Sequence, residues 1–130
     1  MVFIVHGTQR FLDRARGPFG GPDDTSDTSL GAWYANVLFW KPQVALFVNE
    51  KTLLPVLMSV APAATVVDRF PASLSDVLLA LGVDRRFTEA EVTRMAEHRL
   101  AKTNSRSVLG TMNDFVFMAE HIRRRDDSKD

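Results

Sequence analysis

Short runs of apolar and β-branched residues alternate with turn-forming residues along the first half of the chain, and they predict strands. Val2 to His6 is one such run and is expected to be a buried strand. Three more runs, at residues 32–40, 44–49 and 52–58, predict a meander of three antiparallel strands. Because proline cannot donate a hydrogen bond to a neighbouring strand, Pro55 indicates that the last strand of this meander lies at an edge.

Apolar residues at helical spacing replace this pattern in the second half of the chain. A helix is predicted to begin at Pro62, to be broken or restarted by Pro71, and to end at Gly82. The sequence Thr88-Glu89-Ala90-Glu91 has the form of a capping box, which predicts a second helix from there to about His98.

Three further elements complete the expected set. Residues 9–15 should form a short helix capped by Thr8, residues 99–103 a short strand, and residues 107–124 the last helix. The core face of that last helix should carry Val108, Met112, Phe115, Ala119 and Ile122. Strands followed by helices are typical of the α+β class. We therefore expect a small, mainly antiparallel sheet, made of the three-strand meander and the N-terminal strand, packed by about four helices on one face.

Residues 17–31 are rich in Gly, Pro, Asp, Ser and Thr and predict a mobile loop. The loop carries three acidic residues that could bind a cation: Asp23, Asp24 and Asp27. The glycine and the closing glutamate of a calcium loop are missing, so a solvated loop is favoured over a metal site. We expect one domain over residues 1–125 and a frayed tail at 126–130.

Composition narrows the classes of function. The 130 residues include 16 basic and 16 acidic ones, and this neutrality disfavours a dedicated nucleic-acid binder, although a local basic patch is compatible with it. Cysteine is absent, which excludes disulfides, thiolate metal sites and a cysteine nucleophile. The three histidines lack metal-ligand spacing, and the N-terminus lacks the features of a signal peptide. We expect a cytoplasmic protein without metal, cofactor or membrane span, and its oligomeric state is open.

The most site-like stretch runs from Lys102 to Asp114. Its first part, Lys102-Thr103-Asn104-Ser105-Arg106-Ser107, places two cations and several hydroxyl groups directly before a predicted helix. Free N–H groups and the positive end of the helix dipole favour an anion such as phosphate or carboxylate there. The glycines of a Walker A loop are absent. The alternative, favoured on physical grounds, is that Ser105 or Ser107 caps the helix while Lys102 and Arg106 are solvated.

Gly110, Asn113 and Asp114 lie inside the predicted last helix, where all three have poor helix propensity. One explanation is a close backbone approach at Gly110 together with an ion pair from Asp114 to Arg106 or Lys102. Another is a polar site. A buried structural hydrogen-bond network is at least as good an explanation.

Trp33, Asn36 and Asn49 are candidate ligand-binding residues in the meander, because asparagine is depleted in strands. Each asparagine could stabilise a turn or the hydrogen bonding between strands, or could direct its amide into a pocket. The aromatic residues of the meander are expected in the core. A base-stacking platform needs exposed aromatic residues among basic ones, and the meander offers only Lys41 and Lys51.

Three blocks of sequence resemble a known family. They are Leu30 to Asn36 (LGAWYAN), Leu46 to Leu53 (LFVNEKTL) and Ala101 to Phe115 (AKTNSRSVLGTMNDF). They resemble a family of small uncharacterised bacterial proteins, a domain of unknown function, over nearly the whole chain. The resemblance implies a fold and a set of signature positions, and it implies no established activity.

The leading hypothesis is an intracellular binding or regulatory domain that engages a protein partner or an anionic ligand near residues 102–107. The alternative is a small enzyme acting on a phosphorylated or nucleic-acid substrate, with Asp114 or Glu50 as general base and with Lys102 and Arg106 stabilising charge. A third hypothesis is one component of a two-protein module, such as a toxin–antitoxin pair.

Overall fold

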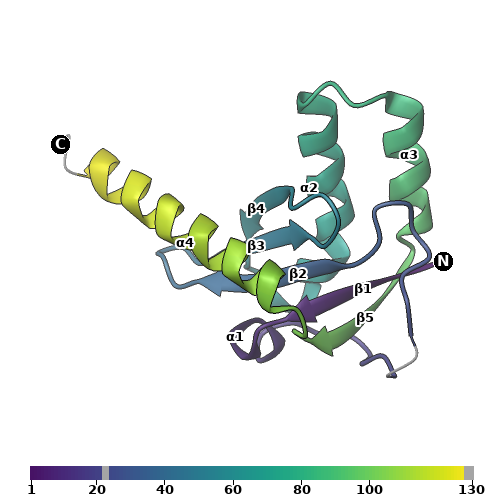
Figure 1. Cartoon of the computed structure of the whole chain (residues 1–130), viewed down its shortest axis with the longest axis horizontal. Helices are drawn as coiled ribbons and strands as arrows, with labels where there is room; N and C mark the ends of the chain where they lie inside the picture. The colour runs from purple at the N-terminus through teal and green to yellow at the C-terminus, as the bar shows by residue number, and fades with distance from the viewer. Residues whose placement is uncertain (22–23, 128–130) are drawn as a thin grey trace.

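A five-stranded mixed sheet forms the centre of the computed structural model, which describes residues 1–21 and 24–127 (Figure 1). The strands lie in the order β4-β3-β2-β1-β5. Their bounds are Val2–Gly7 for β1, Trp33–Leu38 for β2, Val44–Asn49 for β3, Pro55–Ser59 for β4 and Glu97–Lys102 for β5.

Strand pairing confirms the α+β class and the three-strand meander. β2 pairs antiparallel with β3, and β3 pairs antiparallel with β4, so the strand that contains Pro55 lies at an edge as predicted. β1 pairs parallel with both β2 and β5. Because β1, β2 and β5 run in the same direction, their carboxyl ends meet at one edge of the sheet, which we call the carboxyl edge.

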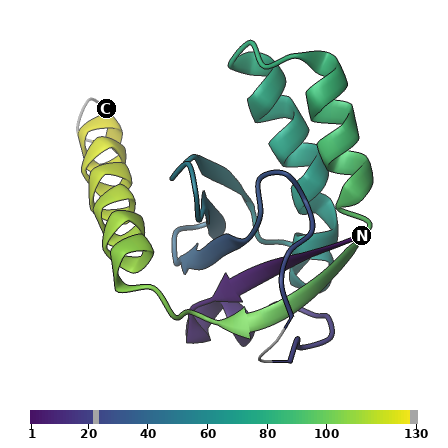
Figure 2. The ribbon, with the colours of Figure 1, turned by 45° about the vertical axis from the view of Figure 1, so that its right-hand side comes forward.

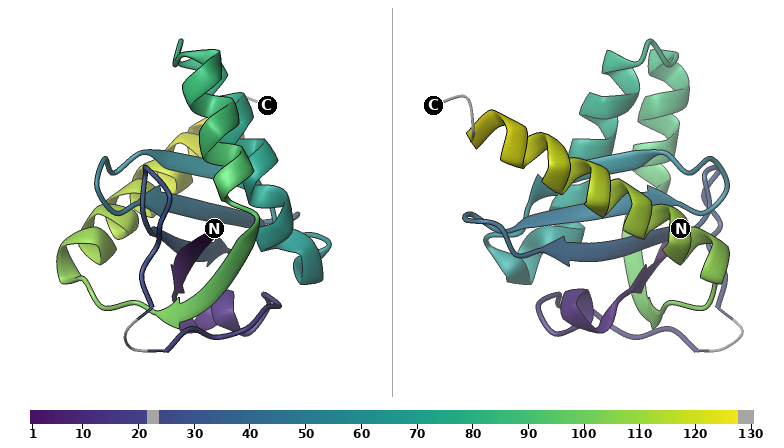
Figure 3. Two further views of the ribbon diagram at one scale, coloured as in Figure 1. Left: turned by 90° about the vertical axis from the view of Figure 1, so that its right-hand side faces the viewer. Right: turned by 60° about the vertical axis from the view of Figure 1, so that its left-hand side comes forward.

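Helices lie on both faces of the sheet, so the expectation of helices on one face only was wrong. The helices are α1 (Gln9–Leu12), α2 (Val66–Ala80), α3 (Arg85–Arg94) and α4 (Arg106–Asp127). α1 and α2 pack on one face, and α4 crosses the other (Figures 2 and 3). The physical reason is that β2 and β3 bury apolar side chains on both faces, and each face needs its own cover.

The face that α2 covers carries the larger core. Phe70 of α2 stacks on Phe47 of β3 with ring centroids 4.1 Å apart, and it meets the ring of Trp33 edge-on at 4.9 Å. Phe11 of α1 meets Phe47 edge-on at 5.5 Å. Each buried ring of this kind contributes about 2–3 kcal/mol to stability by leaving water. Trp33, a candidate ligand-binding residue from the sequence, is therefore part of this core.

The N-terminal half of α4 covers the other face of the sheet. Val108 and Met112 are buried there, as predicted, against Tyr34 and its neighbours on β3. The predicted core position at Ile122 is wrong, because α4 continues past the sheet and leaves this side chain 56% exposed (Figure 1). Neither α4 nor any other helix in residues 1–21 and 24–127 has the length and apolar character needed to cross a membrane.

α2 is continuous from Val66 to Ala80, so the predicted break at Pro71 is wrong. The helix begins later than Pro62, after a 3-10 turn. Buried side chains lie both before and after Pro71, and their packing keeps the helix continuous. This packing outweighs the roughly 3 kcal/mol that an internal proline costs. Gly82 lies just after the helix with a φ of +82°, as expected for a C-terminal stop.

The predicted capping box at Thr88–Glu91 is wrong. α3 begins earlier, at Arg85, because the carboxylate of Asp84 caps it and accepts two backbone N–H groups, the nearer at 2.7 Å. Thr88 and Glu91 lie inside the helix and are buried. The helix also ends earlier than predicted, at Arg94, and β5 is longer than the predicted strand.

The described part of the 17–31 segment is hydrogen-bonded to the sheet. Ser26 and Asp27 accept backbone N–H groups of β1 at 2.9 and 2.7 Å, and Gly20 donates to a carbonyl of β5 at 3.0 Å. The segment thus covers strand groups that no other strand reaches. Asp23 and residues 128–130 of the predicted tail lie outside the described residues, whereas α4 includes residues 126 and 127.

Candidate functional site

The stretch before α4 is a capped helix start. The hydroxyl of Ser105 accepts the Val108 N–H at 3.3 Å, which confirms one of the two capping residues that the sequence suggested. Lys102 and Arg106 are exposed on either side of it. Their ammonium and guanidinium groups are therefore available to solvent or to an anionic ligand.

Gly110, Asn113 and Asp114 are all exposed on α4. A side chain added at Gly110 would meet open space, so no close backbone approach explains this glycine. Within the part of the chain that the structure describes, Asp114 forms no ion pair with Lys102 or Arg106. The explanation by a buried hydrogen-bond network is therefore wrong, and these residues form an open helix surface.

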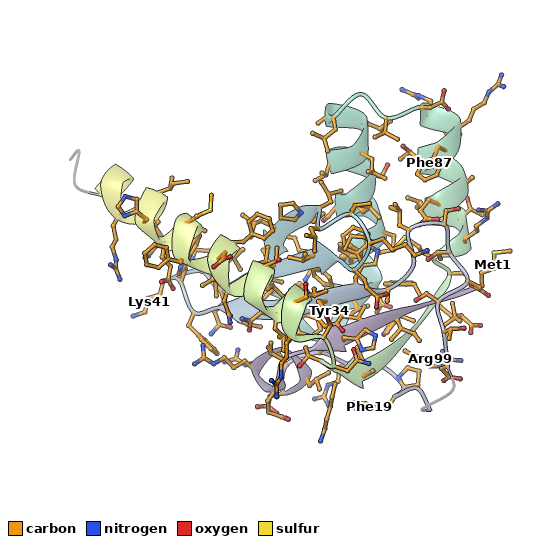
Figure 4. The ribbon with its side chains drawn as sticks, in the orientation of Figure 1. Met1, Phe19, Tyr34, Lys41, Phe87 and Arg99 are labelled. Atoms are coloured by element: carbon orange, nitrogen blue, oxygen red, sulfur yellow. The ribbon has the colours of Figure 1, made fainter. Side chains whose placement is uncertain are left out.

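Tyr34 lies beside the start of α4 (Figure 4) and forms a connected polar unit with His6 and Asn104. The Tyr34 hydroxyl donates to Oδ1 of Asn104, and the tyrosine ring stacks on the His6 imidazole with centroids 4.8 Å apart. Nδ1 of His6 lies 2.9 Å from the carbonyl oxygen of Lys102. Since a carbonyl only accepts, Nδ1 carries the hydrogen, and in the neutral ring Nε2 is left as an acceptor.

The proton of Tyr34 is held tightly in this unit. Burial raises the pKa of the Tyr34 phenol above its ordinary value of 10.0, and the nearby Glu50 carboxylate raises it further, although hydrogen bonds with Asn104 and Ser105 act in the opposite direction. The phenol is therefore a hydrogen-bond donor throughout the physiological pH range.

This raised pKa predicts a loss of stability in alkali. The folded protein binds the phenolic proton more tightly than the unfolded chain, so the stabilisation is complete below about pH 10 and is lost as the pH rises through the folded-state pKa. Tyr34→Phe should remove this dependence. Because Tyr34 is the only tyrosine, phenolate absorbance during titration measures its pKa directly. Phenolate appearing at the same pH in the folded and the urea-unfolded protein would contradict the prediction.

A polar cavity of about 260 Å³ lies next to this unit. Its walls come from β1, the 17–31 segment, the β3–β4 turn and the residue before the Ser105 cap. The lining residues are Ile4, His6, Asp24, Thr25, Ser26, Gly31, Ala32, Glu50, Lys51 and Asn104. We call this cavity the polar pocket.

The polar pocket combines groups of opposite charge. Lys51 supplies an ammonium group, and Glu50 and Asp24 supply carboxylates. Gly31 has a φ of +75°, and a side chain there would lie 3.1 Å from the Lys51 side chain, so glycine leaves room for this lysine along the pocket wall. In residues 1–21 and 24–127 no group of three or more His, Asp or Glu side chains could hold a metal ion.

Two of the sequence candidates, Asn104 and Glu50, meet in the polar pocket, and the other candidates lie elsewhere. Asn36 accepts hydrogen bonds from the Thr8 hydroxyl and the Val37 N–H, both at 2.8 Å, and thereby joins the start of α1 to β2. Asn49 is fully buried and makes a local hydrogen-bond network. Both asparagines therefore use their side chains to hold the backbone at the ends or turns of strands, which is the interpretation that the sequence favours.

His6 and Lys51 are pocket residues that the sequence reasoning missed. The sequence spacing of the histidines tests His6 only as a metal ligand. The available signal was its position as a polar residue that ends an otherwise apolar strand. Lys51 had no signal, since a lysine in a turn is ordinarily solvated.

The fold and the polar pocket define a class: a small α+β domain with a mixed five-stranded sheet and a polar cavity beside the start of its last helix. The chain belongs to the family described as a domain of unknown function, DUF6933, whose model matches residues 4–130. This confirms the family resemblance noted in the sequence. No curated protein and no solved structure shows a significant match to the chain.

Proposed function

We propose that this domain binds a small ligand that carries an acidic group and a hydrogen-bond-donating group, with the polar pocket as its binding site. The observation that supports the proposal is the convergence of donors and acceptors from four separate parts of the chain on one cavity. Sites for small molecules are concave and hold a few polar groups fixed by the fold. The acidic group of the ligand would lie beside the start of α4, as the sequence suggested. Its main contacts would be Lys51 and Asn104 and not Lys102 and Arg106.

The chemistry of the lining groups gives each end of the ligand a partner. The Lys51 ammonium group and the side-chain amide N–H of Asn104 suit the acidic group, because Oδ1 of Asn104 is already engaged by Tyr34. Nε2 of His6 and the Glu50 carboxylate suit the donor group. A simple anion alone fits less well, since Glu50 and Asp24 would repel it.

Thermal-shift screening and calorimetry test this proposal. The probes are inorganic phosphate, nucleoside monophosphates and α-amino acids. We expect at least one probe with both kinds of group to bind, and we expect Lys51→Ala and Asn104→Ala each to weaken binding by roughly 10-fold or more, as the loss of a charge-assisted hydrogen bond does.

Arg85→Ala is the matched control, because Arg85 is an exposed cation of α3, outside the pocket. It should leave the affinity unchanged. Equal weakening by Lys51→Ala and Arg85→Ala would show general charge attraction and would refute the assignment of the pocket.

An enzymatic role is a second candidate, supported by the fixed tautomer of His6. A histidine whose Nδ1 hydrogen is anchored to a carbonyl presents Nε2 as a general base, and Glu50 shares the same cavity. Asp114, the other proposed base, is on the exposed surface of α4 and does not line the pocket. His6→Gln would separate the roles: a loss of turnover with retained ligand affinity supports catalysis, and a loss of affinity alone supports binding.

A further inference from the structure

The carboxyl edge of the sheet gathers basic residues that are far apart in sequence. Three segments follow the ends of β1, β2 and β5 there: residues 9–14, 39–43 and 102–107. The basic residues of these segments are Arg10, Arg14, Lys41, Lys102 and Arg106, and Asp13 is the only acidic one. All five basic residues are exposed. β1 and β5 end side by side, because Gly7 pairs with Lys102. β2 continues from Ala35, the partner of Gly7, to Leu38, so the ends of β2 and β5 lie roughly 14 Å apart.

An exposed aromatic ring lies within this basic surface. Phe39, directly after β2, is 50% exposed, although aromatic residues of the meander were expected in the core. The guanidinium carbons of Arg10 and Arg14 lie 5.3 and 5.5 Å from the centre of its ring. Arg14 also donates to the Gln43 side chain at 2.6 Å, which fixes its position beside the ring. Folding of α1 against β2 thus supplies the basic neighbours that the meander alone lacks.

Acidic residues concentrate at the opposite edge of the sheet. Asp27 and Glu97 lie beside the starts of β1 and β5, and Glu50 follows the end of β3, which runs the other way. Lys51 and Arg99 accompany these acidic residues, so the opposite edge carries charges of both signs, whereas the carboxyl edge is predominantly basic. A positive surface of this kind attracts polyanions although the net charge is zero.

We propose that the carboxyl edge binds single-stranded nucleic acid. The arginines and lysines would contact phosphates, and an unpaired base would stack on the exposed part of the Phe39 ring, beside Arg10 and Arg14. A positive surface with an exposed aromatic ring is the combination that single-strand binding uses, because every base has a π-face and a duplex hides it. Neither Phe39 nor any of the five basic residues lines the polar pocket, so the proposal does not rest on the ligand proposed above.

Fluorescence anisotropy with labelled oligo(dT) and oligo(U) of about 12 nucleotides tests the proposal. The wild-type protein should bind both, with an affinity that falls steeply between about 50 and 200 mM salt. Arg10→Glu combined with Arg14→Glu should weaken binding at least 10-fold and lower the slope of log K against log salt by about 1–2. Phe39→Ala should weaken binding by about 5- to 100-fold with an unchanged salt slope.

The matched control is Arg85→Glu combined with Arg86→Glu, which changes the net charge equally on exposed residues of α3, away from the carboxyl edge (Figure 1). This variant should bind like the wild type. Phe39→Leu keeps a large apolar side chain and removes the aromatic ring, so it distinguishes a loss of base stacking from a loss of folding. Thermal melts verify the fold of each variant.

Three outcomes would overturn the proposal. The first is no binding by the wild type at about 50 mM salt. The second is equal weakening by the two charge-reversed variants. The third is a duplex or inorganic polyphosphate bound as tightly as the single strands, with no effect of Phe39→Ala or Phe39→Leu. The third result would show a general polyanion surface in place of a single-strand site.

Discussion

Asn49→Asp is expected to lower the free energy of unfolding by about 3 kcal/mol or more, although the two side chains have nearly the same shape. Asn49 is 0% exposed. Its Nδ2 donates to the carbonyls of Leu30 and Ala32 at 2.9 and 3.4 Å, and its Oδ1 accepts from the backbone N–H groups of Lys51 and Thr52 at 3.0 and 2.9 Å. A carboxylate in this position directs a negative oxygen at two carbonyl oxygens, with the N–H donors of the amide lost.

The penalty should depend on pH with a definite sign. Burial and the two carbonyls favour the protonated form of the introduced carboxyl, so its pKa in the folded state is raised above the unfolded value. The protein therefore regains stability as the pH falls and loses it as the pH rises through that pKa. Urea unfolding at about pH 5 and pH 8 measures the difference.

Asn113→Asp is the matched control, because it makes the same chemical change on the exposed surface of α4. It should change stability by less than about 0.5 kcal/mol. An Asn49→Asp protein as stable as the Asn113→Asp protein at pH 8 would show that the hydrogen bonds of Asn49 are unimportant for stability.

The second large effect is expected at Glu91, a carboxylate that is 1% exposed. Its two oxygens accept the N–H groups of Ser29 and Leu30 at 2.9 and 2.7 Å. Glu91→Ala leaves both N–H groups without this acceptor, and hydrogen bonds to a charged group contribute about 1.5–3 kcal/mol each. We expect a loss of roughly 2–4 kcal/mol in the free energy of unfolding.

Glu89→Ala on the same helix is the control, since Glu89 is exposed and its loss should cost less than about 1 kcal/mol. Equal small losses for the two variants would contradict the role of Glu91. Because Glu91 holds the N–H of Leu30 and Asn49 holds its carbonyl, the double variant should be less destabilised than the sum of the single ones. Calorimetry and urea unfolding of the four proteins measure that coupling.

These two residues also connect stability with the polar pocket. Together they hold residues 29–32, and Gly31 and Ala32 of this segment line the pocket. Loosening the segment should therefore weaken ligand binding even though neither Asn49 nor Glu91 lines the cavity.

The meander could be predicted because the sequence features that define it lie within short stretches of the chain. Alternation of side chains, the turns between the strands and the edge position of Pro55 all follow from neighbouring residues. The helix boundaries were harder, because two local signals competed. Thr88 and Glu91 match a capping box, yet Asp84 caps the helix, and Glu91 is held inside by the backbone of a segment 61 residues away.

The candidate site was predictable only in part, for the same reason. Asn104 and Glu50 were candidates because of their residue types within the family blocks. Lys51 lies beside Glu50 in the same block, but a lysine in a turn is ordinarily solvated, and His6 lies outside the three blocks. The exposure of Phe39 was missed because its basic neighbours come from α1.

The sequence by itself determined the α+β class, the first strand, the meander with its proline edge, and the capped start of the last helix. Each depends on the order of residues within one segment. The tertiary structure alone decided that β1 lies between β2 and β5 and runs parallel to both. That pairing forms the polar pocket and the basic carboxyl edge from segments up to about a hundred residues apart, because a contact between distant segments is set by the packing of the whole core and not by the residues next to either one.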